Sequence, residues 1–221
     1  MEKLQIWGDS ILKGVVFDEA RNRYAILREN CVSQLAALLP CTVENHARMG
    51  CTAPQAMELL LPEALSPCGL ALIEYGSNDC AIDWPAVAAQ PDADHQPQTP
   101  LADFARLLTQ LVTRVREAGM QAMLAVPPPL HAQRYFDWVT RDLNREAVLA
   151  FLGGTHRIYR WQELYAQTVF MVASRLQCPV LNLREAFLDV RAYEDLLCVD
   201  GMHPNARGHQ VMLDVLKAAF V

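Results

Sequence analysis

Three residues near the start of the chain, Gly8-Asp9-Ser10, have the types and order that could supply a nucleophile. They follow Leu4-Gln5-Ile6-Trp7, a stretch typical of a buried strand. A strand that ends here would deliver Ser10 to the carboxyl edge of a sheet, where open α/β folds keep their active sites. The glycine gives the backbone freedom to turn and lets a ligand approach. Taken alone, the tripeptide also fits a helix start in which Asp9 or Ser10 is only the cap.

A candidate base for this serine lies near the other end of the chain, in Asp200-Gly201-Met202-His203. A serine hydroxyl is a weak nucleophile until a neighbouring base removes its proton. Among the six histidines, His203 is the one with an acid three residues earlier on a glycine-containing loop. Asp200 could bind one imidazole nitrogen and leave the other for Ser10. The other five histidines are expected at surface or packing positions.

Acyl transfer also requires fixed donors for the negative charge that develops on the attacked carbonyl oxygen. The candidates are the backbone N–H of Gly50, the side-chain amide of Asn78 and the N–H of Ser10 itself. Gly50 follows the short strand candidate 41–45, and Asn78 lies in Gly76-Ser77-Asn78-Asp79. Each of these residues alone fits a turn or a helix start equally well. Their occurrence together, after different strands, favours a catalytic site.

Five strand candidates would position these residues, and they cover residues 4–7, 41–45, 69–75, 121–126 and 179–183. Helical patterns lie between or after them, at residues 25–39, 52–60, 101–118, 143–152, 157–176 and 206–220. This alternation predicts an α/β fold with a parallel sheet. The loops that follow parallel strands emerge at one edge of the sheet, so the candidate site residues can converge there.

Two stretches without periodicity could border a substrate site. Residues 83–100 are rich in Pro, Asp, Gln and Ala, and they are predicted to form a long loop that acts as a rim or lid, with room for one helical turn at residues 85–89. Residues 127–138 are predicted to form an irregular arm that carries Tyr135, Phe136 and Trp138. Together with Trp84, these aromatic residues could stack on a sugar ring or cover an acyl chain. Alternatively, they could pack onto the body of the protein.

The composition of the 221-residue chain fits one globular domain, residues 1–221, with 52% hydrophobic and 20% charged residues. A net charge of −6 without a basic stripe argues against nucleic acid or an anionic membrane surface as a partner. We find no leader pattern and no apolar stretch of about 18 residues, which predicts a cytoplasmic protein without integral membrane association. The seven scattered cysteines contain no Cys-x-x-Cys pair and fit reduced thiols.

The four blocks together resemble the SGNH hydrolases, also called the GDSL esterase/lipase family. That family carries Gly-Asp-Ser near the N-terminus, a glycine in a second block, Gly-x-Asn-Asp in a third, and Asp-x-x-His near the C-terminus. This chain has all four blocks in the same order over nearly its whole length. The resemblance implies a catalytic triad of Ser10, Asp200 and His203, with an oxyanion hole of Ser10, Gly50 and Asn78.

The resemblance also implies a flavodoxin-like three-layer α/β/α sandwich, with a five-stranded parallel sheet in the order 2-1-3-4-5. The second block departs from the family pattern, because Ala47 stands where a glycine is common. Cys51 and Cys80 follow the second and third blocks directly, and we expect them to be small packing residues near the pocket.

These features predict a serine hydrolase that cleaves a carboxylic ester through an acyl-enzyme intermediate. The expected substrate is a small molecule with a short acyl chain, or a carbohydrate O-acetyl ester. An acyl thioesterase or a lysophospholipase could use the same triad. An alternative that is not an enzyme is a carbohydrate- or acyl-binding protein descended from one. The presence of Ser10, Asp200 and His203 argues against it.

Metal-dependent chemistry is the remaining rival interpretation. A metallophosphoesterase would need Asp-x-His near the first strand and several histidine ligands at strand ends, and the sequence has neither pattern. We therefore expect no metal and no cofactor. Exposed loop aromatics would allow a homodimer.

Overall fold

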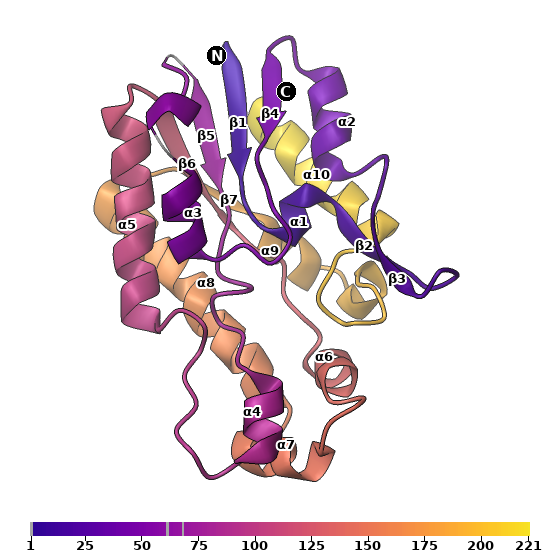
Figure 1. The fold of residues 1–221 in the computed structure, drawn as a ribbon. Helices are drawn as coiled ribbons and strands as arrows, with labels where there is room; N and C mark the ends of the chain where they lie inside the picture. The colour runs from indigo at the N-terminus through magenta and orange to yellow at the C-terminus, as the bar shows by residue number, and fades with distance from the viewer. Residues whose placement is uncertain (1, 61, 68) are drawn as a thin grey trace.

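A five-stranded parallel sheet forms the centre of the computed structural model, which describes residues 2–60, 62–67 and 69–221 (Figure 1). In chain order its strands are β1 (Lys3–Trp7), β4 (Thr42–Asn45), β5 (Leu70–Ile73), β6 (Gln121–Val126) and β7 (Val180–Asn182). Their order across the sheet is β4-β1-β5-β6-β7. Numbered within this sheet, that order is 2-1-3-4-5, so the predicted fold class and strand order are confirmed.

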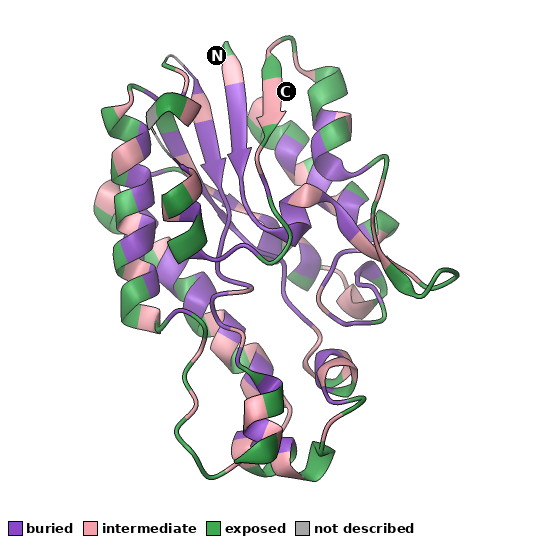
Figure 2. Ribbon diagram, viewed as in Figure 1, coloured by how far each residue is buried: buried purple, intermediate pink, exposed green. Residues whose placement is uncertain are grey.

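The strands are apolar over most of their length because helices cover both faces of the sheet (Figure 2). Successive side chains of a strand point to opposite faces. In β1, Leu4 and Ile6 therefore enter one core while Trp7 enters the other. Since β1 pairs with both β4 and β5, its carboxyl end lies in the middle of the sheet edge.

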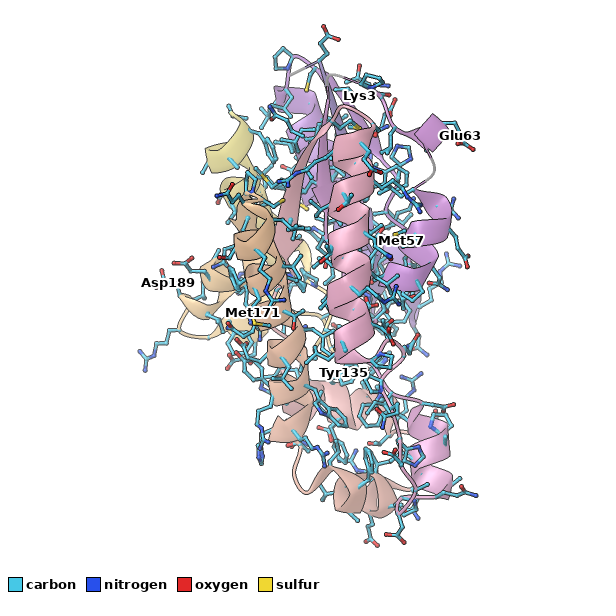
Figure 3. All side chains as sticks on the ribbon, turned by 90° about the vertical axis from the view of Figure 1, so that its left-hand side faces the viewer. Lys3, Met57, Glu63, Tyr135, Met171 and Asp189 are labelled. Carbon is cyan, nitrogen blue, oxygen red and sulfur yellow. The ribbon has the colours of Figure 1, made fainter. Side chains whose placement is uncertain are left out.

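Three helices cover the Trp7 face of the sheet, namely α3 (Ala53–Leu59), α5 (Leu101–Glu117) and α8 (His156–Leu176). Figure 3 looks onto this face and shows Met57 on α3 and Met171 on α8, on either side of α5. The opposite face is covered by α2 (Cys31–Leu38), α9 (Leu183–Leu188) and α10 (Ala206–Phe220). Two short 3₁₀ turns complete the body, η1 (Pro62–Ala64) and η2 (Tyr193–Leu196).

A helical arm extends beyond the carboxyl edge of the sheet (Figure 1). It consists of α4 (Trp84–Ala89), α6 (Ala132–Val139), α7 (Arg145–Leu152) and the first turns of α8. The arm has its own hydrophobic cluster, which includes Trp84, Tyr135 and Phe136, and Figure 3 shows Tyr135 among crowded side chains. The prediction that residues 127–138 are irregular throughout was therefore wrong. Residues 132–139 form the helix α6, because its apolar side chains pack against those of α4 and α7 in this cluster.

A small antiparallel hairpin, β2 (Val15–Asp18) and β3 (Arg23–Ile26), follows the short helix α1 (Ser10–Lys13). The sequence patterns predicted no strand in this region and a helix over residues 25–39, which was wrong at its N-terminal end. Asn30 delays the helix, because its side chain caps α2 by accepting from the N–H groups of Val32 and Ser33. Residues 23–26 pair with residues 15–18 instead.

The described residues form no helix that is both long and apolar enough to cross a membrane. Six of the seven cysteines are described, and all six are free thiols. Cys68 lies outside the described residues.

Candidate active site

Ser10 is the first residue of α1, and this short helix follows directly after the end of β1 (Figure 1). The helix begins at this residue because the carboxylate of Asp9 caps it, accepting a hydrogen bond from the N–H of Ile11 at 2.8 Å. The turn brings Ser10 to the carboxyl edge of the sheet, and its side chain is largely buried.

Gly8 is required by close packing and not by a turn. Its φ lies outside the left-handed region, but a Cβ at this position would lie 3.1 Å from Oε2 and 3.2 Å from the carbonyl oxygen of Glu74. These contacts are tighter than ordinary van der Waals contact. The glycine thus allows Glu74, the residue directly after β5, to approach the end of β1 closely, and the approaching group is protein and not ligand.

His203 and Asp200 lie in one tight loop beside Ser10. An isolated bridge between Leu197 and Pro204 closes the loop at its base. The Nε2 atom of His203 lies 2.9 Å from Ser10 Oγ, and its Nδ1 atom lies 2.6 Å from Asp200 Oδ2. The three predicted residues therefore form a continuous hydrogen-bonded chain, although Ser10 and His203 are 193 positions apart in the sequence.

The surroundings of Asp200 keep its carboxylate ionised. Burial alone would raise the pKa of Asp200, but hydrogen bonds from His203 and from the N–H groups of Met202 and His203 hold it below its usual value. An ionised carboxylate can only accept, so Nδ1 of His203 carries a proton and Nε2 is left to accept from the Ser10 hydroxyl. This is the proton arrangement that a general base requires.

Gly50 and Asn78 lie on the loops that follow β4 and β5, at the same edge of the sheet. Gly50 has a φ of +75°, which a residue with a side chain adopts only under strain. The Nδ2 atom of Asn78 donates to Asp9 Oδ2 at 2.9 Å and to the carbonyl oxygen of Cys51 at 3.3 Å. Asn78 therefore lies between the residue before Ser10 and the residue after Gly50.

Three buried carboxyl groups lie behind this edge: Asp9, Glu74 and Asp79. Burial raises the pKa of Asp9 to about 6 and raises that of Glu74 well above its usual value, each further affected by the charge of its neighbours. Burial also raises the pKa of Asp79, whose Oδ1 accepts from the N–H of Ala53 at the start of α3. The acid of the Gly-x-Asn-Asp block thus fixes α3 against the site.

Several residues that support the site were not singled out from the sequence. The sequence predicted Asp9 only as a possible cap and Glu74 only as part of the strand 69–75, and Tyr24 falls outside every predicted element. Tyr24 lies on the β2–β3 hairpin, and its hydroxyl donates a hydrogen bond of 3.1 Å to Asp200 Oδ2. Asn45 donates to the carbonyl oxygen of Leu12 and so ties the Gly50 loop to α1. A buried acid inside a strand was the one signal in the sequence that could have identified Glu74.

Cys51 and Cys80 are both buried next to the predicted oxyanion residues. Burial raises the pKa of Cys51 and raises that of Cys80 to about 12, so both remain thiols at neutral pH. Within residues 2–60, 62–67 and 69–221, no group of three or more His, Cys, Asp or Glu side chains is arranged to hold a metal ion.

Similar proteins share this fold over nearly their whole length. A lipase/acylhydrolase from Enterococcus faecalis is 19% identical, with a TM-score of 0.68 over 99% of this chain and 95% of its own. A member of the lipolytic G-D-S-L family from Veillonella parvula DSM 2008 is 13% identical, with a TM-score of 0.66 over 99% and 97% of the two chains. An acetylxylan esterase from Geobacillus stearothermophilus is 17% identical, with a TM-score of 0.66 over 99% and 94%.

The sequence itself identifies the class of enzyme. A family model described as the GDSL-like lipase/acylhydrolase family matches residues 6–211, which include all four sequence blocks. With the shared fold, this match defines the protein as a hydrolase that acts on ester bonds. The chain belongs to the GDSL-like lipase/acylhydrolase family. No curated protein sequence is significantly similar to it.

Proposed function

We propose that this protein is a serine esterase in which Ser10, His203 and Asp200 form the catalytic triad. The hydrogen-bonded chain from Ser10 Oγ through both ring nitrogens of His203 to Asp200 is the observation that carries this proposal. As Ser10 Oγ attacks the ester carbonyl, Nε2 of His203 takes the hydroxyl proton. Asp200 holds the ring in place and stabilises the imidazolium that forms.

Two further steps complete the reaction. The protonated His203 gives its proton to the leaving alkoxide oxygen, and the acyl group remains on Ser10 as an ester. A water molecule, deprotonated by His203, then attacks this acyl-enzyme and releases the acid, which restores the Ser10 hydroxyl. No metal or cofactor enters these steps.

The proposed oxyanion hole consists of the N–H groups of Ser10 and Gly50 and the side-chain amide of Asn78. The N–H of Ser10 is the first of α1 and has no acceptor within the helix. Both hydrogens of the Asn78 amide have acceptors in the resting site. The contact with Cys51 is the longer of the two, so the oxyanion would take over that hydrogen while Asp9 keeps the other.

The expected substrate carries a short acyl group, with an acetyl group on a carbohydrate as the leading candidate. Trp84, Tyr135 and Phe136 could have lined a long acyl channel, but they are buried inside the helical arm. The fold shared with an acetylxylan esterase supports the carbohydrate candidate. Of the four aromatic residues predicted to border the site, Trp138 is the one that is only partly buried, and it could contact a sugar.

The segment 83–100 would act as a fixed rim in this scheme. Its first half forms α4, which packs against α7. At its other end, the N–H of Thr99 donates to the carbonyl oxygen of Asp79 at 3.0 Å, directly after Asn78. Both ends of the segment are thus attached to the arm or the site, which favours a rim over a mobile lid.

Hydrolysis of p-nitrophenyl esters with acyl chains of two to sixteen carbons tests this proposal. We expect the highest kcat/KM with acetyl or butyryl esters, and a loss of about 10⁴-fold or more in Ser10→Ala and in His203→Ala. Ser174→Ala, an exposed serine on α8, should keep its rate within about twofold. A maximum at long chains would overturn the proposed substrate, and a Ser10→Ala variant with most of its activity would overturn the triad.

A further inference from the structure

The carboxylate of Asp200 has a second side-chain partner besides His203. The hydroxyl of Tyr24 donates to Oδ2 of Asp200 at 3.1 Å, and this is the same oxygen that accepts from His203 Nδ1 at 2.6 Å. The other oxygen, Oδ1, accepts from the N–H groups of Met202 and His203 at 3.0 and 3.1 Å. Asp200 therefore accepts four hydrogen bonds from the described residues, and of these only the one from Tyr24 comes from outside its own loop.

The β2–β3 hairpin delivers Tyr24 to this position and is itself attached to the loop. The N–H of Phe17 on β2 donates to Sγ of Cys198, two residues before Asp200. The rings of Tyr24 and Phe17 pack edge to face, with centroids 5.3 Å apart, and both contact Trp138 on α6. The Tyr24 ring also lies against the His203 ring, with centroids 5.1 Å apart. These contacts fix the hydroxyl against Asp200.

A donor on Oδ2 changes what Asp200 offers to His203. The negative charge of this oxygen is shared between the two hydrogen bonds, so the Tyr24 hydroxyl weakens the attraction between Asp200 and a protonated His203. Tyr24 and His203 thus share one oxygen of Asp200.

We propose that Tyr24 is a positioning residue of the proposed triad, which acts through Asp200 to orient His203 and limit its basicity. The inference rests on the proposed function, because it assigns Tyr24 a role in the same reaction. Tyr24 itself does not touch the reacting atoms. Its hydroxyl donates the hydrogen bond to Asp200, and the packing of its ring holds the hydroxyl in place.

Other charged and titratable groups surround the pair and must stay unchanged in a test. They are Asp9 before α1, Glu19 in the hairpin, Tyr135 on α6, Arg141 after α6, Cys198 in the Asp200 loop, and His209 on α10. Among the described residues, only His203 and Tyr24 donate side-chain hydrogen bonds to Asp200 Oδ2. A variant that removes the Tyr24 hydroxyl alone therefore isolates its effect.

Tyr24→Phe is that variant, since it keeps the ring and its contacts. We expect the acid limb of kcat/KM to move to higher pH by about half a unit, which lowers the rate on that limb by about threefold. The plateau at higher pH should change by less than about twofold. Tyr193→Phe is the matched control, because it removes a hydroxyl that donates to the carbonyl oxygen of Leu130, and its acid limb should not move.

A second measurement needs no substrate. The protonation of His203, followed by NMR of the ring nitrogens in ¹⁵N-histidine-labelled protein, should have a higher midpoint in Tyr24→Phe than in the wild type, by the same half unit. An unmoved midpoint and acid limb in a folded Tyr24→Phe protein would overturn the inference, even if the plateau rate fell. A wild-type protein that hydrolyses no ester would instead contradict the proposed function, and the NMR titration would still test the link from Tyr24 to His203.

Discussion

The geometry of Asn78 depends on a carboxylate that does not itself react. Asp9 Oδ2 accepts from the Asn78 amide at 2.9 Å, while Asp9 Oδ1 caps α1 through the N–H of Ile11. One side chain thus fixes both the proposed oxyanion donor and the helix that begins with Ser10. Because the donor is oriented before substrate binds, little reorganisation is needed when charge develops on the substrate oxygen.

Asn78→Ala should therefore lower kcat by about 10²- to 10³-fold with a small effect on KM, because an oxyanion donor acts mainly in the transition state. Steady-state kinetics with a short-chain p-nitrophenyl ester would measure this loss. Asn144→Ala is a matched control, since Asn144 only caps α7, and it should keep kcat within about twofold. Equal losses in the two variants would remove Asn78 from the oxyanion hole.

Glu74 presents a different problem, because it is fully buried and its Oε1 atom has no hydrogen-bond partner among the described residues. Its Oε2 atom lies 3.5 Å from the backbone nitrogen of Asp9. Burial and the nearby charge of Asp9 raise the pKa of Glu74 well above its usual value. In the folded protein Glu74 keeps its proton at pH values where the unfolded chain has lost it. The free energy of unfolding therefore falls as the pH rises through this interval.

Glu74→Gln removes this titration while keeping the shape of the side chain. The wild type should lose stability as the pH rises from 5 to 8, and the variant should not lose this part. We therefore expect the difference in the free energy of unfolding, variant minus wild type, to grow by up to about 1.4 kcal/mol per pH unit. Urea denaturation at the two pH values would measure the change. Glu117→Gln, at an exposed position of α5, should differ from the wild type by the same amount at both pH values. A pH-independent effect of Glu74→Gln would mean that the buried carboxyl is already ionised.

Among the elements, the hairpin and the helical arm distinguish this chain from the bare α/β sandwich. The hairpin follows α1 and reaches Asp200, so it connects the beginning of the chain with the loop near its end. The arm has its own hydrophobic cluster, and hydrogen bonds such as that from Arg134 to the carbonyl oxygen of Glu194 attach it to the body. We therefore expect the arm and the sheet to unfold together.

The arm can be tested with two leucines of α7. Leu152 is 3% exposed within the cluster, whereas Leu149 on the same helix is 42% exposed. We expect Leu152→Ala to lower the free energy of unfolding by about 2–5 kcal/mol, and Leu149→Ala to change it by no more than about 0.5 kcal/mol. Chemical denaturation would measure both. If Leu152→Ala left global stability unchanged, the arm would unfold independently of the body and the fixed rim would be untenable.

Over the whole molecule, the sequence predicted correctly those parts in which neighbouring residues form a clear apolar or amphipathic pattern. The mostly apolar runs 4–7 and 121–126 predicted central strands, and the amphipathic pattern of 206–220 predicted the last helix to the residue. The hairpin was missed because Ala25 and Ile26, at the end of β3, fit the helical spacing predicted for residues 25–39, and the cap at Asn30 places the start of the helix after them. The partners of the site were harder to find. Tyr24 and Glu74 act through contacts across the fold, which spacing along the chain does not reveal.

Covalent labelling of the intact protein tests the central claim most directly. A fluorophosphonate reacts only with a serine whose hydroxyl is activated by a neighbouring base. Intact mass and peptide mapping should show one adduct per chain, on Ser10, with no adduct in Ser10→Ala and much slower labelling of His203→Ala. A folded wild-type protein that takes up no label, or a Ser10→Ala protein labelled as fast as the wild type, would contradict the assignment of Ser10 as the nucleophile.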